Sequence, residues 1–221
     1  QVAMDNNGNA VIVWQQDDDS GNTQVFKSEY LNSTWTPTPS QVSTNNSSSP
    51  QVAMDDNGNT VIVWMQDDSS HYQQIFKSEY LKEAWTNPSP VSTNNSTVTD
   101  VCSPQVAMDD NGNAVIVWVQ YFPIYSSHQV FKSEYRNRTW TNPSLLDNPL
   151  GYMSTNPQVA MDDNGNTVIV WERYDKAHED TVGSSWLVFK SEYRNSTWTA
   201  SQVSSSSTDR FDAYSPQVAM D

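Results

Sequence analysis

A repeated pentapeptide constrains the fold of this chain more than any other feature. QVAMD begins at Gln1, Gln51, Gln105, Gln158 and Gln217, with spacings of 50, 54, 53 and 59 residues. In the third unit it is followed by DNGNAVIVW, a variable stretch, QVFKSEYRNRTWT and a second variable stretch, and the other full units follow the same plan. A period of this size is typical of solenoids, propellers and arrays. We expect a single domain of repeats 1–50, 51–104, 105–157 and 158–216, with one extra strand at 217–221.

The pattern inside each unit predicts four β-strands. Asn-Gly stands between two apolar segments in every unit, and this dipeptide is the strongest short signal for a hairpin turn. QVAM before the turn is the first strand, and AVIVW or TVIVW after it is a second strand that is apolar on both faces, as expected between two other layers. VFKSEY forms the third strand, and the fourth begins at TWT. No segment shows a sustained helical period.

Four antiparallel strands in each unit suit one blade of a β-propeller, whose neighbouring blades bury the second strand. The sequence P-Q-V-A-M-D-D-N-G-N-A-V-I-V-W, followed by a strand and T-W, resembles the sialidase-type (BNR-like) propeller repeats of bacteria. It is most similar to the highly repetitive propellers of bacterial surface and secreted proteins. This resemblance covers the whole chain and implies an all-β propeller, but its motifs specify a fold and not a reaction.

The final SPQVAMD repeats the start of a blade without the rest of it. Three arrangements follow from this. The segment 217–221 competes with Gln1–Asp5 for one position in a closed four-bladed ring, it begins a further blade, or it pairs with another copy of the chain. We favour a part of a larger ring or a ring completed by a second chain, so self-association through 217–221 or through further blades is expected.

Charge and cysteine content exclude several classes of partner. The formal net charge is −15 and only 11 residues are Lys or Arg, whereas nucleic-acid binding requires basic side chains that neutralise phosphates. We therefore expect no nucleic acid and no membrane insertion. Cys102 is the only cysteine, which excludes an internal disulfide and a cysteine-rich zinc site.

The resemblance also allows a test for catalysis. A sialidase-type site is expected to need three arginines that grip a carboxylate, a Tyr–Glu nucleophile pair and an acidic proton donor. The first two units contain no arginine, since the five arginines are Arg136, Arg138, Arg173, Arg194 and Arg210. A Glu-Tyr pair is present once in every unit, which favours a structural role. We therefore expect that the chain is not an enzyme.

The loops after the second and fourth strands of each blade are expected on one face, and they differ between units. Variable loops on a fixed scaffold are the usual place for recognition. Their aromatic residues are the candidate ligand-binding residues, because aromatic rings stack on sugars and anchor protein contacts: Tyr72, Tyr121, Tyr125, Tyr174 and Trp186. Alternatively, these rings only cover the blade edge. We expect a non-enzymatic extracellular or cell-surface module that binds a glycan or a cell-surface protein; the alternative is a self-assembling scaffold.

Two further patterns have a structural and a functional interpretation. The acidic runs provide candidate metal ligands in Asp17, Asp19, Asp67 and Asp68, with Ca²⁺ as the cation because it prefers oxygen ligands; no other cofactor is expected. The DDNGN turn also alternates oxygen ligands, but a plain hairpin turn is favoured there. Lys27 and Glu29, which recur in every unit, share one face of the third strand. They form either an ion pair that fixes blade packing or a polar pocket for a sugar.

Overall fold

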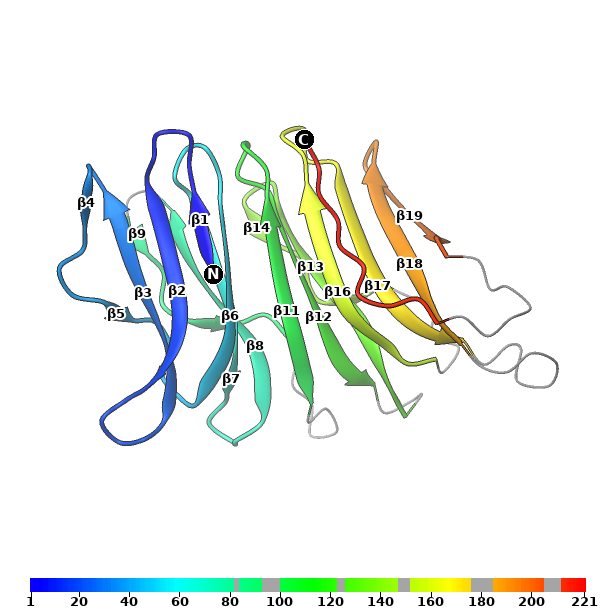
Figure 1. Ribbon diagram of the computed structural model, residues 1–221, viewed down its shortest axis with the longest axis horizontal. Coiled ribbons are helices and arrows are strands. Elements are labelled where there is room, and N and C mark those ends of the chain that lie inside the picture. Colours follow the sequence, from blue (N-terminus) through cyan, green and yellow to red (C-terminus); the bar gives the residue numbers. More distant parts are fainter. Residues whose placement is uncertain (82–83, 93–99, 123–125, 147–151, 176–184, 205–211) are drawn as a thin grey trace.

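The structure is a computed structural model that describes residues 1–81, 84–92, 100–122, 126–146, 152–175, 185–204 and 212–221. Within these residues the chain consists of strands, turns and loops, and none of it is helical (Figure 1). The same residues accordingly contain no helix that is long and apolar enough to cross a membrane. Four antiparallel sheets follow one another along the sequence, which confirms the predicted all-β architecture of four repeats.

Each repeat forms one sheet, called blade 1 to blade 4 in chain order. Blade 1 contains β1 (Val2–Met4), β2 (Ala10–Asp17), β3 (Thr23–Leu31), β4 (Thr34–Trp35) and β5 (Ser40–Gln41). Blade 2 contains β6 (Ser47–Met54), β7 (Thr60–Asp67), β8 (Gln73–Leu81), β9 (Ala84–Trp85) and β10 (Ser89–Pro90). Blade 3 contains β11 (Val101–Met108), β12 (Ala114–Phe122), β13 (Ser127–Arg136), β14 (Thr139–Trp140) and β15 (Ser144–Leu145). Blade 4 contains β16 (Ser154–Met161), β17 (Thr167–Asp175), β18 (Ser185–Arg194) and β19 (Thr197–Gln202).

The blades stand side by side in an open row. The first strands β1, β6, β11 and β16 contact one another in succession, and they also touch the second strands of neighbouring blades. Blade 1 and blade 4 lie at opposite ends of the row (Figure 1). The Asn-Gly turns project from one edge, called the turn face. The connections between second and third strands project from the opposite edge, called the loop face.

The turn between the first two strands is a five-residue loop capped by aspartate. In blade 1 the Asp5 N–H donates to the Asn9 carbonyl at 3.0 Å. The Asp5 Oδ1 accepts the Asn7 and Asn9 backbone N–H groups at 2.9 and 2.8 Å. Only Gly8 has positive φ, at 81°, so this loop differs from a two-residue Asn-Gly hairpin, in which both residues do. Because the carboxylate oxygens accept hydrogen bonds from the loop itself, the plain-turn interpretation of DDNGN holds.

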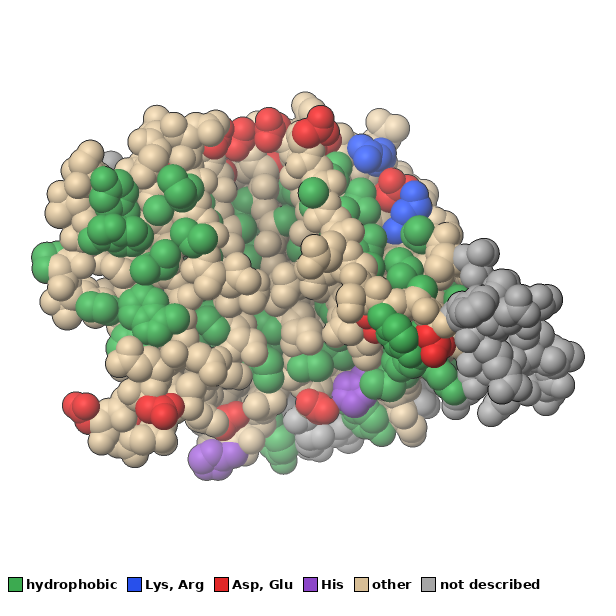
Figure 2. Space-filling model, in the orientation of Figure 1, with side chains coloured by type: hydrophobic (Ala, Val, Ile, Leu, Met, Phe, Trp, Pro, Cys, Tyr) green, Lys and Arg blue, Asp and Glu red, His purple; other side chains and the backbone are tan. Residues whose placement is uncertain are grey.

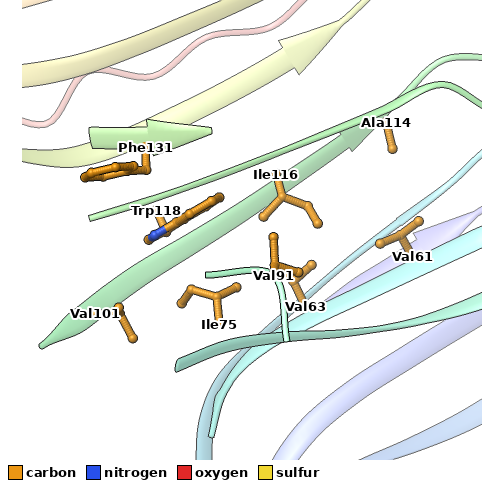
Figure 3. Close-up of a cluster of buried hydrophobic side chains, with 9 residues drawn as sticks. All are labelled: Val61, Val63, Ile75, Val91, Val101, Ala114, Ile116, Trp118 and Phe131. Carbon is orange, nitrogen blue, oxygen red and sulfur yellow. The ribbon is translucent and has the colours of Figure 1, made fainter. Parts of the chain in front are cut away.

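The core lies between blades and is centred on the second strands. In β7 and β12 both faces are buried, and Trp64, Trp118 and Trp171 have no exposed surface. Figure 3 shows one such cluster, in which Val63 and Ile75 of blade 2 face Ile116 and Trp118 of blade 3. Burial of aliphatic and aromatic side chains between two sheets provides the main stabilisation of such a junction. The prediction that the second strand is covered on both faces is confirmed.

Proline divides the fourth strand in three of the four blades. Blades 1 to 3 carry two short pieces in place of one strand, and Pro37, Pro39, Pro88 and Pro143 lie between the pieces. Proline has no N–H to donate to a sheet ladder. Blade 4 reads TWTASQ at this position, and β19 pairs with β18 without interruption from Thr197 to Gln202.

One polar arrangement joins every pair of neighbouring blades. In blade 1, Lys27 forms an ion pair with Glu29. The Trp85 Nε1–H of blade 2 donates to Glu29 Oε1 at 2.6 Å, and the Lys27 Nζ lies 4.4 Å from the centre of the Trp85 ring. The same contacts join blades 2 and 3, and blades 3 and 4, through Trp140–Glu79 and Trp198–Glu134. The Lys–Glu repeat therefore forms an ion pair as predicted, but within one strand and not between strands or blades, and a tryptophan of the next blade is its third partner.

The segment after blade 4 follows the course of a first strand. Ser215 has a φ of 53°, like Ser49, Ser103 and Asn156 at the same position in the repeat. The Ser215 N–H donates to Glu172 Oε1 at 2.6 Å, as the Ser49 N–H donates to Gln15 Oε1 at 3.1 Å. Residues 217–221 have no ladder partner and are not a strand in the sense predicted, because a strand requires a second one beside it.

Candidate functional site

Two of the predicted ligand-binding residues meet at the loop face of blade 4. Tyr174 on β17 and Trp186 on β18 lie directly opposite each other in the sheet register. Their ring centres are 5.4 Å apart, with an angle of 57° between the planes. Cross-strand aromatic pairs of this kind stabilise the end of a hairpin. The pair thus places two packed aromatic rings at this end of blade 4.

The terminal segment adds a third ring and a carboxylate to this pair. The ring of Tyr214 lies 6.4 Å from that of Trp186. Asp212 accepts the Trp186 backbone N–H at 2.8 Å through Oδ1 and the Tyr214 hydroxyl at 2.9 Å through Oδ2. The backbone N–H of Ala213 donates to the Trp186 carbonyl at 2.9 Å. We call Tyr174, Trp186, Tyr214 and Asp212 the aromatic cluster.

The hydrogen bond to Asp212 fixes the chemistry of the Tyr214 hydroxyl. The bond to this carboxylate, with partial desolvation and the Asp212 charge, raises the pKa of Tyr214 above its ordinary value. The hydroxyl therefore stays protonated, and its hydrogen points to Asp212. Its oxygen still has lone pairs that accept a hydrogen bond. Tyr214 is 57% exposed, so much of this side chain is open to solvent.

The other predicted aromatic residues do not join this cluster. Tyr121 packs against His128 across β12 and β13, with ring centres 5.5 Å apart, and His128 Nε2 lies 2.9 Å from Asp100 Oδ2. Tyr72 has no ring partner among the described residues, and its backbone N–H donates to Asp68. Tyr125 lies outside the described residues. The structure therefore brings together Tyr174 and Trp186 but places Tyr121 and Tyr72 in other blades.

Sequence reasoning missed Tyr214 and Asp212. Both stand just before SPQVAMD, the segment that repeats the start of a blade. In the full repeats the equivalent residues pair with the second strand of their own blade, as Ser47 does with Gln66. Residues 212–214 instead contact β18 of blade 4, so the repeat pattern does not predict their place.

A polar cavity lies at the loop face between blades 1 and 2. It has a volume of about 620 Å³ and is lined by amide, hydroxyl and acidic groups, including Asn22, Thr44, Asn45, Asn46, Asp67 and His71. Such groups provide both donors and acceptors. The cavity is therefore suited to a polyhydroxylated molecule rather than to an apolar one.

The candidate metal ligands mostly hold their own loops. Asp68 Oδ1 accepts the backbone N–H groups of Ser70 and Tyr72 at 2.8 and 3.0 Å. Asp17 accepts the Thr23 hydroxyl at 2.8 Å, Asp67 accepts the Asn46 amide at 3.5 Å, and Asp19 is exposed. Within the described ranges, no three His, Cys, Asp or Glu side chains lie together as a metal site. Calcium binding stays a prediction.

Acidic side chains also gather along the turn face (Figure 2). Asp110, followed by other neighbouring charges that include Asp56, raises the pKa of Asp163. The carboxylates of successive blades are therefore close enough to repel one another. This edge carries much of the negative charge that the composition predicts.

No known protein family matches this chain, and no curated protein matches it either. Solved structures do match. An ulvan lyase, described as a new family of polysaccharide lyase, aligns with 90% of this chain and 56% of its own, with a TM-score of 0.58 and 10% identity. A Hadza microbial sialidase aligns with 90% of this chain and 45% of its own, with a TM-score of 0.57 and 13% identity. Penicillium chrysogenum α-L-arabinanase, complexed with arabinobiose, aligns with 99% of this chain and 70% of its own, with a TM-score of 0.57 and 12% identity.

These similarities establish a sialidase-like propeller fold. The chain spans between 45% and 70% of the length of these three structures. The expectation that the chain is not an enzyme is contradicted, since the similar structures are those of a lyase, a sialidase and an arabinanase. The lack of arginine in the first two units counts only against the sialidase type of reaction, whereas the same fold also supports other chemistry on glycans.

Proposed function

We propose that this protein recognises a glycan at its loop face, with the aromatic cluster of blade 4 as the main platform. The observation that carries the proposal is the row of three rings, Tyr174, Trp186 and Tyr214, held in place by Asp212. Sugars present apolar C–H faces that stack on aromatic rings, and hydroxyl groups that need polar partners. The cluster offers both.

The polar groups of the cluster suit a sugar hydroxyl. The Tyr214 oxygen is an acceptor, because its hydrogen is donated to Asp212. The cavity between blades 1 and 2 lies on the same face and offers amide and hydroxyl groups. A polymeric glycan would be able to contact more than one of these surfaces. The names of the similar structures, which include an ulvan lyase, a sialidase and an arabinanase, also support a glycan ligand.

An extracellular or cell-surface location follows from the same proposal, because polymeric glycans are found there. The acidic surface is compatible with neutral glycans or with anionic glycans bound through a cation such as Ca²⁺. A cell-surface protein is the other ligand class expected from an exposed aromatic surface.

The test is a binding screen with ulvan, arabinan and sialylated glycans, each with and without Ca²⁺. We expect at least one polymer to bind and to raise the melting temperature, as a ligand specific for the folded state does. Trp186→Ala should weaken this binding at least tenfold. Trp35→Ala is the control, since Trp35 is a 45% exposed tryptophan that lies on blade 1, away from the aromatic cluster. Equal loss in both variants, or no binding to any glycan, would refute the proposal.

The same samples should be assayed for new reducing ends and for unsaturated products. Either product would make the protein a glycan-active enzyme, and its loss in Trp186→Ala would place substrate binding at the aromatic cluster. Product release that is unchanged in Trp186→Ala would place the active site elsewhere and contradict this part of the proposal.

A second candidate function is assembly with another blade of the same kind, supplied by a second copy of the chain. It is favoured by the two ends of the row, which carry complementary halves of the blade junction. At one end Trp35 is 45% exposed, and its Nε1–H has no acceptor among the described residues. At the other end Lys190 and Glu192 are 36% and 29% exposed, compared with 11% and 10% for Lys132 and Glu134 within a junction.

Light scattering of this chain at increasing concentration tests the assembly. A head-to-tail contact would pair Trp35 with Glu192 of a second copy, so we expect a mass above 24.9 kDa that Glu192→Gln and Trp35→Ala both reduce. A contact that closes gives a ring, and one that does not close gives a filament. A constant mass of one chain at all concentrations would contradict the assembly and leave the glycan proposal unaffected.

A further inference from the structure

A cavity lies at the turn face between blades 1 and 2. Its volume is about 450 Å³, and its lining includes Glu29 and Leu31 from blade 1 and Gly58, Thr60 and Tyr80 from blade 2. Glu29 Oε1 accepts hydrogen bonds from both Lys27 and Trp85. Glu29 Oε2 has no donor among the described residues, although only 12% of this side chain is exposed. A carboxylate oxygen with capacity for one more donor therefore faces a cavity.

The junction between blades 3 and 4 shows what such a cavity holds. There the residue equivalent to Leu31 is Arg136. Its Nε donates to Glu134 Oε2 at 3.1 Å, and its Nη2 donates to the Gly165 carbonyl at 3.1 Å. The Nη2 also lies 3.4 Å from the Thr167 Oγ1, and the guanidinium carbon lies 4.0 Å from the centre of the Tyr193 ring. Four groups of the junction thus bind one guanidinium.

The same four groups line the cavity of the first junction. Glu29 corresponds to Glu134, Gly58 to Gly165, Thr60 to Thr167 and Tyr80 to Tyr193, as the repeat alignment of the sequence gives them. The Thr60 hydroxyl donates to the Gly58 carbonyl at 3.2 Å, as the Thr167 hydroxyl does to Gly165 at 3.3 Å. The acceptor set is therefore the same, and only the guanidinium is replaced by Leu31.

The second junction differs in ways that make it a natural comparison. Ala114 stands there in place of the threonine. Glu79 uses both of its carboxylate oxygens, since Oε2 accepts from Lys77 and Oε1 from Trp140. Leu81 occupies the position of Leu31. This junction offers a guanidinium fewer free acceptors than the first.

We propose that the cavity between blades 1 and 2 binds a guanidinium group, such as the arginine side chain of a partner protein or a small guanidine. A planar guanidinium donates in a fork to Glu29 Oε2 and the Gly58 carbonyl while its face lies on the Tyr80 ring. An ammonium lacks this planar fork. The net charge of −15 attracts any cation to the protein. The neighbouring Lys27 does not block the site, because it is paired with Oε1.

The test uses butylguanidine as the probe and butylamine as a control of equal charge. We would follow the indole N–H signals of the nine tryptophans by NMR, since the Trp85 indole donates to Glu29. The expected result is a saturable shift of the Trp85 signal with butylguanidine, and binding of butylamine at least fivefold weaker. This readout is independent of the glycan proposal.

Three variants identify the site. Leu31→Arg places the protein's own guanidinium in the cavity, so it should abolish the Trp85 response and raise the melting temperature. Leu81→Arg is the matched control at the second junction and should leave butylguanidine binding unchanged. Arg136→Leu should open a second site, seen as a new shift of the Trp198 indole.

Several outcomes would overturn the proposal: no saturable shift of Trp85 in the natural sequence, equal binding of butylamine, or unchanged binding in Leu31→Arg. If Leu31→Arg does not fold, Tyr80→Leu takes its place. It removes the aromatic face that a guanidinium covers and should weaken binding at least fivefold, and unchanged binding would again refute the site.

Discussion

Trp85 of blade 2 donates its indole N–H to Glu29 of blade 1 over 2.6 Å, and this bond joins two sheets that also share apolar contacts and further hydrogen bonds, such as that from the Ser49 N–H to Gln15. Its equivalents recur at the next two junctions. A carboxylate that is largely removed from water needs such partners. The three bonds therefore specify how successive blades dock, while the buried valines, isoleucines and tryptophans supply most of the stabilisation.

Trp140→Phe should destabilise the protein by about 1.5–3 kcal/mol, the range for loss of a hydrogen bond to a buried charged group. Glu79 loses the donor that lies 2.7 Å away, and Lys77 loses part of the ring that it covers. Urea unfolding measures the change. Trp35→Phe is the matched control, because Trp35 donates no hydrogen bond among the described residues; it should change stability by less than about 0.5 kcal/mol. Equal effects would show that the indole bond does not contribute.

Alanine substitutions of the turn glycines should separate backbone strain from steric clash. Gly8 has a φ of 81° and nothing within 4 Å of an added Cβ, so Gly8→Ala should cost about 1–2 kcal/mol from left-handed backbone alone. At Gly165 an added Cβ would lie 2.8 Å from Asp109 Oδ2 and 3.2 Å from Arg136 Nη1. Gly165→Ala should therefore cost at least about 1 kcal/mol more, as overpacking does. Thermal melts that rank the two in the opposite order would contradict this account.

Stability should fall in acid, partly through Glu134. Burial acts to raise the pKa of Glu134, but the ion pair with Lys132 and the bonds from Arg136 and Trp198 together lower it below the ordinary value of 4.5. The stabilisation is complete above pH 4.5 and is lost as the pH falls towards the lowered pKa, because the unfolded chain then binds a proton that the folded chain does not. The free energy of unfolding, measured between pH 3 and 7, should fall less steeply in acid for Glu134→Gln than for the natural sequence. The same slope in both proteins would contradict a role of Glu134 in the acid dependence.

Alanine substitutions of Asp68 and Asp67 should differ in how much they lower the stability of the protein. Asp68→Ala removes the acceptor of the Ser70 and Tyr72 N–H groups and should cost about 0.5–2 kcal/mol, as the loss of a capping side chain does. Among the described residues, the Asp67 carboxylate has only a 3.5 Å contact with Asn46, so Asp67→Ala should cost less. Repeating both melts with Ca²⁺ and with a chelator tests the calcium prediction. A cost that depends on calcium would assign these carboxylates to a cation.

Much of the fold could be predicted from the sequence, because each blade repeats the same local signals. The segments VFKSEY and AVIVW predict strands from neighbouring residues alone, and the structure has a strand at each, although burial along VFKSEY does not alternate. The five-residue turn was harder to predict, since Asn-Gly alone does not show that Asp5 caps the loop with its side chain. The tryptophan partner of each Lys–Glu pair comes from the next blade, about 60 residues away, and no local pattern shows it.

The candidate site was predicted only in part. Tyr174 and Trp186 were expected on the loop face, but their direct pairing depends on the register of β17 and β18. Tyr214 and Asp212 belong to a segment whose course depends on contacts with blade 4. The difference between Leu31 and Arg136 looks like ordinary variation in the sequence. It gains meaning only when the two junctions are compared in three dimensions.

The prolines of the fourth strands have a consequence for solubility. An unbroken outer strand presents free N–H and C=O groups on which another strand can add, and proline is a common protection against such edge-to-edge association. Blades 1 to 3 have this protection, whereas β19 runs from Thr197 to Gln202 without a proline. Blade 4 is therefore the rim at which unwanted fibrous aggregation would begin, and a proline at Ala200 would be the first change to make against it.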